Sequence, residues 1–157
     1  MIEASNHLTV FVITAFLFQS VLIIHFAMRK WHFEQAIRYG RFVYTLSLPA
    51  VAVSVILLSN DQSWQFWLAG FIYFIWAVFG YTVEYVRGIQ WRNPPIWHIL
   101  LPYVTLYLAT VMFYWWPLAN IYKPLWYIYA GLFVISTLLN ITSHQKNKPF
   151  SQKVGTI

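Results

Sequence analysis

Residues 66–87 read FWLAGFIYFIWAVFGYTVEYVR, and this stretch decides the fold. No charged side chain occurs in it before Glu84, and Arg87 closes it. A helix that crosses the hydrocarbon core of a bilayer needs about 20 apolar residues. A strand of a membrane barrel is about 10 residues long and alternates apolar with polar side chains. The stretch therefore predicts a membrane-spanning helix.

Four other stretches of the chain have the same apolar character. The chain has 157 residues, of which 60% are hydrophobic and 9% are charged, whereas soluble domains carry about 25% charged residues. We therefore expect an all-α, polytopic transmembrane helix bundle over residues 1–141, followed by a polar, basic tail over residues 142–157. The five expected spans cover about residues 8–28, 42–59, 66–87, 97–116 and 122–141.

The basic residues predict the orientation of the bundle. Lys and Arg gather in alternate connections, and short basic connections stay in the cytoplasm. We expect the N-terminus outside and the C-terminus in the cytoplasm of a cell whose plasma membrane holds the protein. Tryptophan, which prefers the membrane–water interface, falls close to the expected helix ends. The basic residues concerned are Arg29, Lys30, Arg38, Arg41, Arg87, Arg92, Lys146, Lys148 and Lys153.

One face of the third span carries small and polar side chains. They recur at spacings of three and four residues, which places them along one side of a helix. In lipid, small residues let helices approach closely, and polar side chains turn toward the bundle. We expect this face to point inward and Glu84 to lie one turn from Arg87, in position to pair with it. The face comprises Gly70, Tyr73, Ala77, Gly80, Glu84 and Arg87.

The ionisable residues of the spans map to one depth, the cytoplasmic ends of the helices. The outer halves contribute tyrosine, serine and threonine instead. Flat rings and hydroxyls suit the lining of a site for a lipophilic molecule. We expect the ligand-binding residues to be His25, Tyr73, Glu84, Arg87, His98, Tyr103, Tyr107, Asn140 and His144.

Three functions fit this pattern. The first is the binding or transport of a lipophilic small molecule at the cytoplasmic end of the bundle. The second is an accessory subunit of a larger membrane complex, or a homo-oligomer, with partner helices on the apolar outer faces. The third is an enzyme acting on a lipid or isoprenoid, with Glu84 and His98 as acid and base. The small number of ionisable residues favours the first two over catalysis.

The sequence predicts no cofactor, no metal and no nucleic-acid partner. The chain has no cysteine, no histidine pair spaced for a metal on a span, and no basic patch interleaved with aromatic residues. Haem ligation through His25, His98 or His144 is the alternative, because imidazole ligates haem iron.

Overall fold

The computed structural model describes residues 2–89, 91 and 94–143, and every regular element in this part of the chain is a helix. The elements, in chain order, are α1 (Ile2–Trp31), α2 (Phe33–Thr45), α3 (Ser47–Ser59), α4 (Trp64–Tyr81), the π-helix η1 (Thr82–Val86), α5 (Trp97–Trp115), α6 (Leu118–Ile121) and α7 (Lys123–Ser143). The expected tail lies outside the described residues, apart from its first two positions.

Among the described residues, five helical segments are long and apolar enough to cross a membrane, which confirms the expected helical architecture. Insertion in a membrane and the orientation of the chain stay predictions. The five segments are His7–Trp31, Phe33–Ser59, Trp64–Val86, Trp97–Ile121 and Lys123–Ser143.

Tryptophan marks the helix ends, as the sequence predicts. Trp31 is the last residue of α1, and Trp64 is the first residue of α4. Trp97 and Trp115 begin and end α5. An indole ring at a helix end can keep its N–H in water while its ring lies against apolar surface.

The second span is longer than the sequence predicts. We expected it to begin near residue 42, because Glu34, Arg38 and Arg41 interrupt the apolar pattern before that point. Instead α2 continues into α3 with a break of one residue, at Leu46. Proline has no N–H to complete the helical ladder, and Pro49 lies in the first turn of α3. The break is therefore a local interruption of one long helix.

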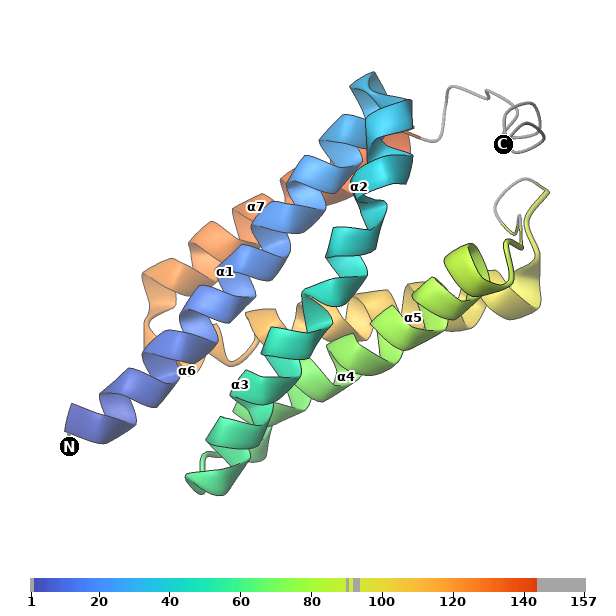
Figure 1. Ribbon diagram of the computed structural model, residues 1–157. Coiled ribbons are helices and arrows are strands. Elements are labelled where there is room, and N and C mark those ends of the chain that lie inside the picture. The colour runs from blue at the N-terminus through green and yellow to red at the C-terminus, as the bar shows by residue number, and fades with distance from the viewer. Residues whose placement is uncertain (1, 90, 92–93, 144–157) are drawn as a thin grey trace.

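The helices form two pairs that α2 and α3 connect. In Figure 1, α1 lies beside α7, α4 lies beside α5, and α3 crosses α4. The α1–α2 connection, the α4–α5 connection and the last turn of α7 lie toward one end, which we call the basic end. The N-terminus, the α3–α4 connection and α6 lie toward the other end. The described basic residues of the basic end are Arg29, Lys30, Arg38, Arg41 and Arg87.

Small residues on α4 set the distance between α3 and α4. A Cβ atom added at Gly70 would overlap the side chain of Ser54 and lie 2.5 Å from the carbonyl oxygen of Ala50. Gly70, Tyr73 and Ala77 are all buried. The inward face that the sequence predicts for the third span is thus the packed face of α4.

Candidate functional site

Glu84 lies in the π-helix that ends the third span. The N–H of Arg87 donates to the carbonyl oxygen of Thr82, five residues earlier, at 2.9 Å. π-turns inside α-helices are rare and frequently occur at functional sites. The extra residue in this turn changes the direction of every side chain after it. Glu84 still faces Tyr44, as Gly80 does, whereas Arg87 is exposed.

The carboxylate of Glu84 is held by two tyrosines from other helices. The Tyr44 hydroxyl of α2 donates to Glu84 Oε2 at 2.8 Å, and it lies 3.2 Å from the Tyr103 hydroxyl of α5. A hydroxyl has one proton, so when Tyr44 donates to Glu84, Tyr103 donates to Tyr44. We call Glu84, Tyr44 and Tyr103 the Glu84 cluster. It joins α2 to the π-helix η1 and to α5.

Gly80 makes room for the Glu84 cluster. A Cβ atom there would lie 2.7 Å from Tyr44 Cε1 and 2.9 Å from Tyr103 Cε2. Gly80 lies one turn before Glu84 on the same helical run. Its missing side chain lets the two tyrosine rings meet against the backbone of α4.

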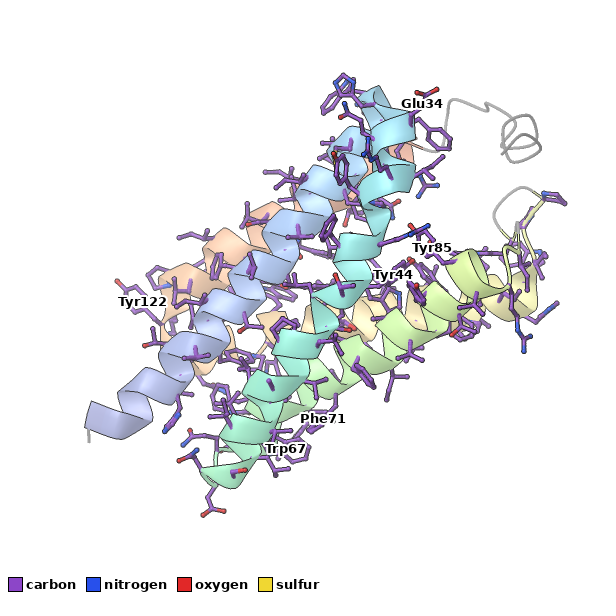
Figure 2. All side chains as sticks on the ribbon, viewed as in Figure 1. Glu34, Tyr44, Trp67, Phe71, Tyr85 and Tyr122 are labelled. Atoms are coloured by element: carbon purple, nitrogen blue, oxygen red, sulfur yellow. The ribbon has the colours of Figure 1, made fainter. Side chains whose placement is uncertain are left out.

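Aromatic rings surround the Glu84 cluster. The Tyr44 ring centroid lies 5.6 Å from that of Trp76 and 6.0 Å from that of Tyr85. The Tyr103 ring lies 4.7 Å from Trp91 and 5.4 Å from Trp76. Figure 2 shows Tyr44 and Tyr85 between α2 and the end of the third span. The tyrosine that binds the half-buried Glu84, and the second tyrosine beside it, therefore pack among aromatic rings.

A second contact joins α1 and α2 to the π-helix beside the cluster. A Cβ atom added at Gly40 would lie 2.7 Å from the Tyr85 hydroxyl and 3.4 Å from His25 Cε1. The guanidinium of Arg41 lies 5.3 Å from the centre of the Tyr85 ring, within the range of a cation–π interaction. His25, expected in the site, thus lies next to Tyr85, the neighbour of Glu84 in the chain.

The remaining expected site residues have different environments. Tyr73 is fully buried and donates to the carbonyl oxygen of Val43, and Tyr107 is buried with its ring centroid 5.8 Å from that of Trp76. Arg87 and His98 are exposed. Asn140 is half-buried in the last turn of α7, where its carbonyl oxygen accepts from Ser143 Oγ at 2.7 Å.

All nine expected ligand-binding residues stay predictions, and so does the pairing of Glu84 with Arg87, because the contacts above do not test them. His144 lies outside the described residues.

The expected site residues did not include Tyr44, which binds Glu84. They did not include Tyr85 or Trp91 either. Gly80 is the one sequence signal beside Glu84: a small residue predicts a close approach of another helix, although it does not identify which residue approaches.

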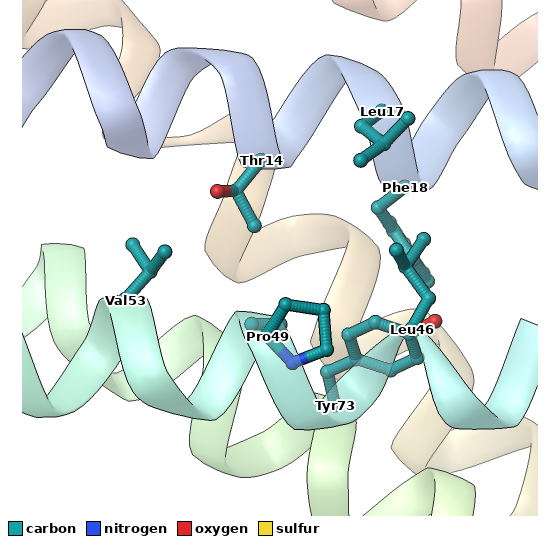
Figure 3. Close-up of a pocket in the computed structure, with 8 residues that line it drawn as sticks. Thr14, Leu17, Phe18, Leu46, Pro49, Val53 and Tyr73 are labelled. Atoms are coloured by element: carbon teal, nitrogen blue, oxygen red, sulfur yellow. The ribbon is translucent and has the colours of Figure 1, made fainter.

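Two hollows can be compared with a ligand pocket in size. A small, partly open cavity of about 50 Å³ lies between α1, the α2–α3 break and Tyr73 (Figure 3). The Thr14 hydroxyl at its edge donates to the carbonyl oxygen of Val10 at 2.8 Å, so its polar group is already satisfied. An open, wholly apolar depression of about 390 Å³ lies along Phe74, Val78 and Thr82 of the third span. Pockets for drug-sized molecules measure about 300–1,000 Å³, and of these two hollows the open depression reaches that size.

Within residues 2–89, 91 and 94–143, no three His, Asp or Glu side chains gather in a group that could hold a metal ion. The described histidines therefore offer no such metal site, and haem ligation stays an untested alternative. Comparison with protein-family models, with curated proteins and with solved structures gives no match.

Proposed function

We propose that this chain is a multi-pass membrane protein that binds a lipophilic small molecule at its basic end, with the Glu84 cluster as the anchor. One observation supports this proposal above the others. A half-buried carboxylate lies within an apolar helix bundle and accepts a hydrogen bond from a tyrosine whose own ring packs against other aromatic rings. An ionisable side chain within a membrane span is costly and is usually functional. The positive-inside rule puts the basic end in the cytoplasm, and the plasma membrane is the membrane we propose.

The chemistry of the cluster selects the polar end of the ligand. An ionised carboxylate only accepts hydrogen bonds, and the one proton of Tyr44 is already directed at Glu84. A ligand group that joins the cluster must therefore donate. Faces of tyrosine and tryptophan also attract cations. The proposed ligand has an apolar body and ends in an amine, an ammonium or another hydrogen-bond donor.

The ligand body lies outside the helix bundle in this proposal. The cavity of about 50 Å³ beside α1 is too small for it. Glu84 is half-buried rather than enclosed, and Tyr81 nearby is 40% exposed. The donor group can therefore reach Glu84 from the side of the bundle while the body stays among lipid chains. Binding of this kind needs no large opening between the helices.

The test compares small molecules that stay with the purified protein. The chain is purified in mild detergent as wild type, as Glu84→Gln and as Glu34→Gln, and extracts are analysed by mass spectrometry. Glu34 is the matched control, because it is an exposed glutamate on α2. We expect one or more donor-bearing lipophilic compounds in the wild type and in Glu34→Gln. Loss of a charged hydrogen bond weakens binding by about 10- to 100-fold, so Glu84→Gln should lack them.

Equal sets of compounds in all three preparations would contradict the proposal. The accessory-subunit and enzyme alternatives stay predictions. The same purification distinguishes the first of these, because a subunit would carry a stoichiometric partner protein that survives Glu84→Gln.

A further inference from the structure

The centre of the bundle contains buried polar atoms that no protein group satisfies. Within the described part of the chain, these atoms are Gln19 Oε1, Trp76 Nε1 and the hydroxyls of Tyr107, Tyr114 and Tyr129. Each of the five side chains is at most 8% exposed. We call them the central polar cluster. They come from four helices: α1, α4, α5 and α7.

The members of this cluster lie in one neighbourhood. The Tyr129 hydroxyl is close enough to those of Tyr114 and Tyr107 to interact electrostatically with both. The rings of Tyr107 and Trp76 are 5.8 Å apart. Gln19 reaches the same region, because its Nε2 donates to Ser136 Oγ at 2.7 Å. The Ser136 side chain lies near Tyr107, although outside hydrogen-bonding geometry with its hydroxyl.

Polar atoms in such a position need a partner. Most buried polar groups in proteins are hydrogen-bonded, and unsatisfied ones point to an unseen water or ligand. The requirement is stricter among membrane-spanning helices, because the hydrocarbon core offers no bulk water. Apolar side chains would fill the same space without this cost. Five unsatisfied atoms in one neighbourhood therefore indicate an occupant.

The hydrogen-bonding capacity of the five atoms indicates what kind of molecule binds there. The amide oxygen of Gln19 accepts, the indole N–H of Trp76 donates, and the three hydroxyls do both. No charged side chain belongs to the cluster, so a bound ion would have no counter-charge there. Water both donates and accepts, and buried waters typically make about three hydrogen bonds each. We infer that ordered water molecules occupy the central polar cluster and bridge α1, α4, α5 and α7.

The central polar cluster lies close to the Glu84 cluster but is separate from it. Tyr107 and Tyr114 are both buried on α5, about 10 Å apart along its axis. The Trp76 ring contacts Tyr107 and also lies 5.4 Å from the Tyr103 ring. The inference of bound water does not depend on ligand binding at Glu84.

Removal of single hydroxyls tests the inference. Tyr114→Phe and Tyr129→Phe each delete a hydroxyl from the cluster, and Tyr127→Phe deletes one from a side chain of α7 that is 66% exposed. A hydroxyl bonded to water stabilises the protein, so each cluster variant should lower the midpoint of thermal unfolding by about 2–4 °C. Tyr127→Phe should leave the midpoint unchanged. If the hydroxyls have no partner, Phe removes a desolvated polar group and the midpoint rises or stays the same, which overturns the inference.

A direct observation of water complements the hydroxyl variants. Solid-state NMR on protein labelled with ¹⁵N-tryptophan, in bilayers, detects transfer of magnetisation from water to each indole N–H. Trp76→Phe identifies the Trp76 signal. We expect a water cross-peak at the Trp76 indole, although this side chain is only 2% exposed. A Trp76 signal without that cross-peak overturns the inference.

Discussion

Substitution of Gly80 tests whether the two tyrosines meet where the structure puts them. In Gly80→Ala, the added Cβ would lie 2.7 Å from Tyr44 Cε1 and 2.9 Å from Tyr103 Cε2. Carbon atoms pack best at about 3.5–4.0 Å, so both rings must retreat by roughly 0.6–0.8 Å. Tyr44 is 6% exposed and Tyr103 contacts two tryptophans, so neither ring can move alone.

The expected loss of stability follows from two opposing effects. Overpacking of a filled interior costs about 1–3 kcal/mol. Alanine is preferred over glycine within a helix by about 0.5–1 kcal/mol. The first effect is larger, so Gly80→Ala should lower the free energy of unfolding by about 1–2 kcal/mol. It should also weaken the hydrogen bond between Tyr44 and Glu84.

Gly131 provides the matched control for this prediction. It lies in α7, and a Cβ atom there would meet nothing within 4 Å. Gly131→Ala should therefore be neutral, or stabilising by up to about 1 kcal/mol. The assay is reversible unfolding in micelles of graded denaturing-detergent content, followed by circular dichroism. If Gly80→Ala is as stable as Gly131→Ala, the close approach of Tyr44 and Tyr103 at Gly80 is wrong.

Three further substitutions have defined outcomes in the same unfolding assay. Gly70→Ala should be more damaging than Gly80→Ala, because its Cβ would lie 2.5 Å from the backbone oxygen of Ala50, and backbone cannot rotate away; equal losses would contradict this. Trp115→Phe removes the indole N–H that donates to the carbonyl oxygen of Trp126 at 3.0 Å, and should cost about 1 kcal/mol while the stacked rings stay in contact. Gln19→Leu removes the hydrogen bonds from α1 to α7 and should cost about 0.6–1.7 kcal/mol. If Trp115→Phe or Gln19→Leu causes no loss of stability, the hydrogen bond that this variant removes is absent.

The spans could be predicted from the sequence because each depends on a local property. Apolar length and tryptophan at the ends are read from one segment at a time, and α4 and α5 begin within two residues of where they were expected. The predicted start of the second span was wrong because Glu34, Arg38 and Arg41 lower the local hydropathy. In the structure these charged residues lie on the exposed side of a helix whose other side buries Ala36 and Gly40.

The candidate site could be predicted only in part. Tyr73, Glu84 and Tyr103 share inward faces of their helices, and helical spacing reveals such faces. Spacing within one helix does not show which helix is the neighbour, so the pairing of Tyr44 with Glu84 was not predictable. The π-turn was not predictable either. It adds a residue to one turn, so Arg87 does not point in the direction that a regular α-helical period predicts for it.

The most direct test of the central claim is the coupling free energy between Tyr44 and Glu84. A double-mutant cycle of unfolding measurements uses Tyr44→Phe, Glu84→Gln and the double variant. In a control cycle, Tyr122→Phe replaces Tyr44→Phe. Tyr122 is suitable because it is 61% exposed in the connection between α6 and α7. A hydrogen bond to a charged group contributes about 1.5–3 kcal/mol, so we predict a coupling of at least about 1 kcal/mol for Tyr44 with Glu84. The control cycle should be additive. Additivity within about 0.5 kcal/mol for Tyr44 with Glu84 would contradict the claim that this tyrosine holds the carboxylate.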